Sequence, residues 1–345
     1  MVPKSSDSSV RDRLLSWDAG WFIRVARDGY PRGYTYGDHG EVTANELAFF
    51  PGFPLMIRAV HAVTGGSFET AALITGSVAG CAATLAVYAL GRQLYDHRTG
   101  VIFATLFCTQ PMSVVLSMGY SEGLFVALAA ATFVLAKRGA WEVAGIFGLG
   151  AALSRPTGAA VALGLAVAAL LRVRSATGRS RWRPLAGALL ALAGMPAYLL
   201  WVGIRAGAPQ AWFDIQTAGW GTTFDVGDSA RRFIFDALRT SDGFVAISVA
   251  WLLVAAVLLA VIAGMQRVWP PLLVYGFLSL TLVLGQAGFF HSKPRLLVPV
   301  LVILLPMALA LGRAKLRVAV PVLVGYAGFG LWYGAYLITV WRFAI

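Results

Sequence analysis

Charged residues are scarce in this chain. Only 13% of the 345 residues are Asp, Glu, Lys or Arg, whereas 58% are hydrophobic. A soluble domain usually has about 25% charged residues, so this chain cannot cover a water-facing surface. A soluble enzyme, a disordered chain and a fibrous protein are therefore excluded. The formal net charge is +12. In a chain this apolar, we expect the basic residues to lie next to a membrane rather than to bind nucleic acid.

Metal-ligand and nucleotide-binding motifs are also missing. The two cysteines, Cys81 and Cys108, fall inside apolar runs without metal-ligand spacing, which indicates small buried side chains. The four histidines are scattered, and there is no Walker loop, dinucleotide-binding turn, nucleophile elbow or D-x-D acidic pair. The sequence therefore predicts no metal site, no nucleotide-sugar site and no other cofactor.

Apolar stretches occupy most of the chain from about residue 70. Since about 20 apolar residues cross a bilayer, they predict an all-α polytopic membrane protein with about ten transmembrane helices. The stretches are 70–91, 101–118, 123–136, 143–154, 156–171, 185–204, 244–264, 270–287, 296–312 and 318–341. Arg155–Gly158 is expected to divide 143–171 into two short helices, because Pro156 breaks a helix. Gly119–Gly123 is a second break, and backbone at such breaks faces a cavity rather than lipid.

The chain is expected to have three parts: a polar tail (1–13), an extracytoplasmic loop with interfacial helices (14–69), and a transmembrane bundle (70–345) that includes an outer loop (205–243). Lys and Arg gather in alternate short loops, which indicates the cytoplasmic side. Most carboxylates then lie on the opposite, extracytoplasmic side. The excess of Arg over Lys suggests a bacterial plasma membrane.

Two aromatic segments on that outer side carry carboxylates. Asp18 lies between Trp17 and Trp21 on an expected amphipathic helix, which suggests a catalytic base held in a dry cleft. A helix-capping role for Asp18 is the alternative. Glu46 precedes a segment rich in Phe and Pro and is the second candidate for the base. The alternative is that this segment only anchors the chain at the membrane interface.

Three cations lie near the expected outer face. Arg155 is the single charge in an apolar block, where burial costs about 3 kcal/mol, so it needs a partner such as Glu122 or a ligand phosphate. A structural ion pair is the alternative. Lys293 and Arg295 suit a phosphate at a helix entrance, or lipid headgroups. The candidate sugar or acceptor contacts are Trp17, Trp21, Tyr120, Glu122, Gln216, Trp220 and His291.

The motifs, taken in order, resemble a known family. W-D-A-G-W-F, E-L-A-F-F-P-G-F-P, Y-S-E and S-R-P-T-G resemble the glycosylphosphatidylinositol mannosyltransferase II family, of the GT-C class, over about residues 14–345. The resemblance implies a GT-C-like bundle and an inverting transfer of mannose from polyprenyl-phosphate-mannose at an extracytoplasmic site. It matches the family's acidic residue to Asp18. Since a bacterium makes no such anchor, the acceptor is expected to be another glycolipid, a lipoglycan, a polysaccharide or a protein.

A secondary transporter or flippase of a lipid-linked or small polar substrate is the alternative function. Transporters also use broken helices and buried charges, but they usually have two related halves. The sequence contains no convincing internal repeat, which favours the transferase.

Overall fold

The computed structural model describes residues 9–175, 181–341 and 343, so the first eight residues of the expected polar tail lie outside it. The described chain is helical apart from the small antiparallel pair of β1 (Thr35–Tyr36) and β2 (Val42–Thr43). The α-helices are α1 Val10–Leu14, α2 Asp18–Asp28, α3 Gly52–Thr64, α4 Phe68–Leu94, α5 His97–Thr109, α6 Glu122–Lys137, α7 Trp141–Ala152, α8 Gly158–Ser175, α9 Trp182–Ala206, α10 Ala211–Trp220, α11 Asp228–Thr240, α12 Phe244–Met265, α13 Pro270–Gly285, α14 Lys293–Leu297, α15 Leu305–Arg313 and α16 Leu316–Thr339. Short 3-10 turns lie at Glu46–Ala48, Ser113–Ser117, Phe290–Ser292 and Leu301–Leu304. The expected all-α membrane fold is confirmed.

Every expected apolar stretch forms a helix, but few of these helices are long enough for a full crossing. Among the described residues, α4, α9, α12 and α16 are long and apolar enough to span a membrane. A fifth span is counted if Phe290–Leu297 and Leu301–Arg313, bent by 73°, are taken together. The expected number was about ten, and it is not reached because helices such as α7, with 12 residues, reach only about 18 Å at 1.5 Å per residue.

The predicted break at Arg155–Gly158 is confirmed, since α7 ends at Ala152 and α8 begins at Gly158. The amide of Gly52 donates to the Leu153 carbonyl at 2.8 Å, next to this break. A Cβ atom at Gly52 would lie 2.4 Å from Ser154 Oγ, so only glycine permits this approach. The Phe/Pro-rich segment before α3 is thereby held against the α7–α8 break.

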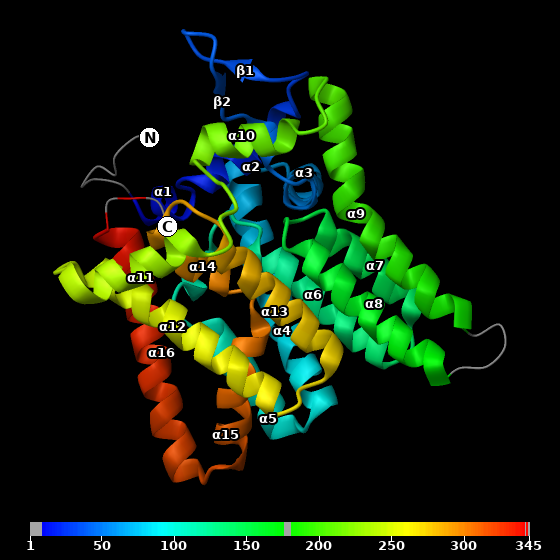
Figure 1. Ribbon diagram of the computed structural model, residues 1–345, viewed down its shortest axis with the longest axis vertical. Helices are drawn as coiled ribbons and strands as arrows, with labels where there is room; N and C mark the ends of the chain where they lie inside the picture. The colour runs from blue at the N-terminus through cyan, green and yellow to red at the C-terminus, as the bar shows by residue number, and fades with distance from the viewer. Residues whose placement is uncertain (1–8, 176–180, 342, 344–345) are drawn as a thin grey trace.

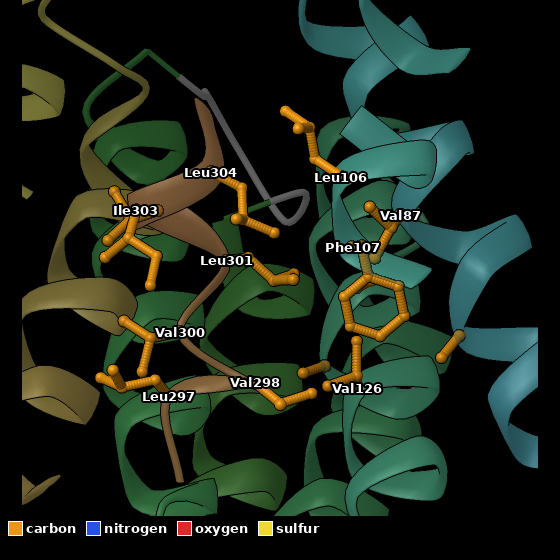
Figure 2. Close-up of a cluster of buried hydrophobic side chains, with 14 of the residues drawn as sticks. Val87, Leu106, Phe107, Val126, Leu297, Val298, Val300, Leu301, Ile303 and Leu304 are labelled. Atoms are coloured by element: carbon orange, nitrogen blue, oxygen red, sulfur yellow. The ribbon is translucent and has the colours of Figure 1, made fainter. Parts of the chain in front are cut away.

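The core packs around the bent segment Leu297–Leu304. Val298 and Leu301 of this segment are fully buried, as are Phe107 of α5 and Val126 of α6. Figure 2 shows Phe107 beside Val126 and Val298, between the bent segment and the neighbouring helices. Close packing of this kind holds membrane helices together. It also fixes α14, the helix that carries Lys293 and Arg295.

The short helices α2, α3 and α10 and the hairpin gather at one end of the molecule. In Figure 1, α2, α3, α10 and the β1–β2 hairpin lie together at the top, whereas the α4–α5 and α15–α16 connections lie at the bottom. The expected interfacial segment 14–69 therefore contains short helices and the hairpin, and α4 begins at Phe68. The expected outer loop 205–243 is itself largely helical, because α10 and α11 occupy it.

Candidate active site

A cavity of about 710 Å³ opens among α2, α10, the α7–α8 break and α14. Apolar and aromatic side chains form most of its wall, and a few polar groups converge on it, as in most small-molecule sites. Eight of the residues singled out from the sequence line it: Trp17, Asp18, Trp21, Arg155, Gln216, Trp220, Lys293 and Arg295. The fold thus brings together groups that are up to 278 positions apart in the chain, from Trp17 to Arg295.

Asp18 is the first residue of α2, directly after a strained turn. Trp17 has φ = 57°, a conformation that costs a non-glycine residue about 1–3 kcal/mol. Backbone and side-chain bonds hold this turn: the Gly119 amide donates to Leu14 O, and Tyr120 Oη donates to Ser16 O, both at 3.1 Å. The single amphipathic helix expected through Trp17, Asp18 and Trp21 is therefore interrupted at Trp17, and α2 begins with Asp18 at the cavity.

Four charged side chains meet at this wall. Arg295 Nη1 lies 2.8 Å from Asp18 Oδ2, and Arg155 Nη1 lies 2.7 Å from Glu122 Oε1. Arg295 Nε lies 3.4 Å from the same Glu122 oxygen. Two guanidinium groups and two carboxylates thus balance one another where an unpaired charge is costly. We call Asp18, Glu122, Arg155 and Arg295 the charge cluster.

The two carboxylates of the charge cluster differ in accessibility. The Asp18 side chain is 23% exposed and lines the cavity, whereas the Glu122 side chain is 1% exposed and lies outside the lining. Asp18 is therefore accessible to a molecule in the cavity. Glu122 lies behind the guanidinium groups, so the structure does not support its expected direct contact with a sugar.

Tyr120 also lies behind the lining, because it is buried beneath Arg295. The Arg295 Cζ atom is 5.0 Å from the centre of the Tyr120 ring, a cation–π contact. Burial raises the pKa of Tyr120 far above its usual value, so the phenol stays protonated and donates to Ser16 O. The expected sugar contact of Tyr120 is replaced by support for Arg295 and for the turn before Asp18.

Lys293 lines the cavity but is already engaged. Its Nζ atom donates to the carbonyl oxygens of Val283 and Gln286, each at 2.5 Å. An ammonium group has three donors, so one N–H remains for a ligand. Arg155 and Arg295 are consequently the stronger candidates for binding a phosphate.

Aromatic rings form the wall on the α2 and α10 side. Trp21 stacks on Phe49 with ring centres 5.6 Å apart, and Trp220 meets both rings edge-on at 5.6 and 5.4 Å. Gln216 Nε2 donates to Ala48 O at 3.1 Å, beside these rings. Flat aromatic faces next to an amide side chain suit the C–H face of a sugar, as expected from the sequence.

Two expected site residues lie away from the cavity. Glu46 pairs with Arg24, with Oε1 3.0 Å from Nε, and is not part of the lining. His291 faces the aromatic rings of Phe289, Trp341 and Phe343 at 5.7–6.2 Å and is also outside the lining. In each case a partner from another segment turns the side chain away, so the structure does not support either residue in its expected role.

Sequence reasoning missed the polar wall between α10 and α13. Residues 222–224 line the cavity because their loop pairs with the end of α13: the Ala287 amide donates to Thr223 O at 2.8 Å, and the Asp225 amide donates to Gly285 O at 2.9 Å. Gln286 joins this wall. The only sign in the sequence is Gln286 itself, a polar residue near the end of the apolar stretch 270–287.

No group of three or more His, Cys, Asp or Glu side chains within the described ranges could hold a metal ion. The expectation that no divalent metal is required stays a prediction.

Sequence comparisons point to mannosyltransferases. A family described as "Dolichyl-phosphate-mannose-protein mannosyltransferase" matches residues 49–201. GPI alpha-1,6-mannosyltransferase 2 of Rattus norvegicus is 30% identical over 166 residues, which are 44% of this chain and 32% of the relative. The Homo sapiens protein of the same name is 30% identical over 148 residues, 36% of this chain and 27% of the relative. The match spans about a third of the length of these relatives.

Structure comparisons show that two solved proteins share this fold. ArnT from Cupriavidus metallidurans, bound to undecaprenyl phosphate, superimposes with a TM-score of 0.54 at 14% identity, over 96% of this chain and 65% of that chain. The Archaeoglobus fulgidus oligosaccharyltransferase gives 0.50 at 16% identity, over 93% and 48%. The predicted resemblance is confirmed. The protein has a GT-C-like fold and resembles the glycosylphosphatidylinositol mannosyltransferases, and its apolar helices indicate a multi-pass membrane protein.

Proposed function

We propose that this protein is an inverting glycosyltransferase that moves a mannosyl unit from polyprenyl-phosphate-mannose to a hydroxyl group of an extracytoplasmic acceptor. The acceptor is a glycolipid, a polysaccharide or a protein, and the membrane is a bacterial plasma membrane. The observation that carries the proposal is that Asp18 and the guanidinium groups of Arg155 and Arg295 line one cavity.

The reaction assigns one role to each kind of group. Asp18 accepts the proton of the acceptor hydroxyl as its oxygen attacks the anomeric carbon of the sugar. The bond from this carbon to the phosphate oxygen breaks, and polyprenyl phosphate leaves with the electron pair. Attack opposite to the leaving group inverts the anomeric centre. Arg155 and Arg295 stabilise the charge that develops on the phosphate.

The ion pair between Asp18 and Arg295 fits this scheme. A phosphate competes for the Arg295 guanidinium, because guanidinium groups bind carboxylates and phosphates in the same geometry. Donor binding then releases the Asp18 carboxylate for the acceptor. Guanidinium groups supply the positive charge at the leaving group, so we expect transfer to persist in EDTA.

The test uses the purified protein in lipid nanodiscs with radiolabelled polyprenyl-phosphate-mannose and a membrane glycolipid extract. Asp18→Asn removes the base without changing the side chain's shape, and transfer should fall about 100- to 10,000-fold. Asp28→Asn is the matched control at the other end of α2, where Asp28 pairs with Arg27 in solvent, and it should keep full activity. Full transfer by Asp18→Asn would reject the proposal.

A further inference from the structure

Glu122 is the least exposed member of the charge cluster and the only one that touches both guanidinium groups. Its Oε1 atom lies 2.7 Å from Arg155 Nη1 and 3.4 Å from Arg295 Nε. The carboxylate does not line the cavity. It therefore cannot bind a sugar or take a proton from an acceptor without a rearrangement of both arginines.

The fold places this carboxylate accurately. Glu122 is the first residue of α6, where the helix dipole favours a negative charge. A Cβ atom at Gly123 would lie 2.8 Å from the Gly80 amide nitrogen, so the start of α6 lies directly against α4. Because α4 is long and apolar enough to span a membrane and α6 lies directly against it, the position of the Glu122 side chain is set by two packed helices.

Each arginine is also held by a second contact on the protein side. Arg155 Nη1 donates to Ser121 Oγ at 3.0 Å, and Arg295 lies over the Tyr120 ring. Ser121, Tyr120 and Glu122 are consecutive residues, so one short segment supports both guanidinium groups. Both arginines nevertheless line the cavity, as does Ser121, so a ligand in the cavity can reach them.

We propose that Glu122 is a positioning residue that holds Arg155 and Arg295 as one two-arginine clamp for the phosphate of the lipid donor. This inference rests on the proposed function. In it, Glu122 fixes the relative positions of the two guanidinium groups and does not supply the positive charge of the clamp. The guanidinium groups must match the leaving phosphate in the transition state, where a small displacement is costly. Binding of the phosphate in the ground state depends more on net positive charge.

Glu122→Gln should affect ground-state binding of the phosphate and its stabilisation in the transition state in opposite ways. The substitution removes one negative charge beside two guanidinium groups, so an anion should bind at least as tightly as before. The amide cannot pair with both guanidinium groups, so the clamp loses its geometry. Cleavage of the donor should therefore fall while binding of the lipid phosphate is kept.

The experiment measures both quantities in nanodiscs without any acceptor. The probes are undecaprenyl phosphate for binding and undecaprenyl-phosphate-mannose for slow cleavage by water. For Glu122→Gln we expect cleavage to fall about 100-fold and the dissociation constant of undecaprenyl phosphate to stay within about threefold of wild type or to decrease. Glu122→Asp keeps the charge but shortens the side chain, so its cleavage should fall less, by about tenfold from wild type, with the dissociation constant again kept.

Glu142→Gln is the control, because Glu142 forms an exposed ion pair with Arg183 outside the cavity; it should leave both quantities unchanged. Equal cleavage by wild type and Glu122→Gln would overturn this inference but not the proposed function. A parallel loss of binding and cleavage would overturn it too, since that indicates a purely structural role. If Glu122→Gln does not fold, the same comparison of lipid-phosphate binding with donor cleavage is made with Glu122→Asp. A wild-type protein that neither binds nor cleaves the probes would instead reject the proposed function.

Discussion

The ion pairs of this protein fall into two groups with similar distances and different surroundings. In the charge cluster, Arg155 and Glu122 approach to 2.7 Å with side chains 14% and 1% exposed. At the start of α7 and α9, Glu142 and Arg183 approach to 2.5 Å with side chains 50% and 62% exposed. The distance between the charges therefore does not distinguish a site from a solvated surface pair, whereas burial and a shared cavity do.

The energetic consequence differs between the groups. An exposed pair contributes about 0–1 kcal/mol because water and salt screen the charges. Removal of one partner from a buried pair costs about 3–5 kcal/mol because the other charge is left unpaired. Loss of a charge in the charge cluster should therefore cost far more than the same loss at an exposed pair.

Arg295→Ala should have the largest effect, because it leaves Asp18 and Glu122 as neighbouring carboxylates without their shared cation. We expect the free energy of unfolding to fall by about 3–5 kcal/mol, with a lower thermal midpoint in detergent. Transfer should fall about 100- to 1,000-fold through loss of phosphate stabilisation. The control is Arg231→Ala, which breaks an exposed pair with Asp228. Near-equal effects of the two variants would remove the distinction between the groups.

Arg155→Lys keeps the charge but loses the planar fork of the guanidinium group. Arg155 uses one nitrogen to reach both Ser121 Oγ and Glu122 Oε1, at 3.0 and 2.7 Å. A lysine ammonium is a single point on a flexible stem, and we expect kcat/KM for the donor to fall about tenfold. Arg183→Lys, at the exposed pair, should leave this constant unchanged. Full activity of Arg155→Lys would show that charge alone is sufficient at this position.

Tyr120→Phe tests the support beneath the charge cluster without changing any charge. The substitution keeps the ring under Arg295 and removes the hydrogen bond to Ser16 O. A neutral hydrogen bond contributes about 1 kcal/mol, which corresponds to about a fivefold loss of transfer if the turn before Asp18 loosens. Tyr88→Phe, which removes a hydrogen bond to His97 at the opposite end of α4, is the control. A loss of stability without any loss of transfer would limit Tyr120 to folding.

The sequence predicted the composition of the site better than its geometry. Asp18 and Arg155 were recognised because each is a charge in an aromatic or apolar context, where its presence needs a reason. Arg295 was recognised because it stands close to Lys293 at an expected helix entrance. Burial of Glu122 and Tyr120 behind the arginines depends on the approach of α6 to α4, which no local pattern records. The Arg24 partner of Glu46 is likewise a tertiary contact.

In the fold, as in the site, features set by local sequence were predicted and features set by tertiary contacts were not. Hydrophobicity predicted the apolar helices from α4 on and the α7–α8 break, because both depend on local composition and on Pro156, but it did not predict α10 and α11 in the expected outer loop. It did not predict which helices cross the membrane completely, because helix length depends on where tertiary contacts stop each helix. The division of the expected helix at Trp17 depends on bonds from residues 119 and 120, about a hundred positions along the chain.

Glu142→Gln should have the smallest effect and completes the comparison. The pair with Arg183 is bidentate, with nitrogen–oxygen distances of 2.5 and 3.0 Å, and it joins the starts of α7 and α9. Since both side chains are at least half exposed, we expect the free energy of unfolding to change little, and less again in high salt. Transfer should be unchanged. A large loss of stability, insensitive to salt, would mean that α7 and α9 depend on this pair in the bilayer, and exposure to solvent would no longer separate the two groups of ion pairs.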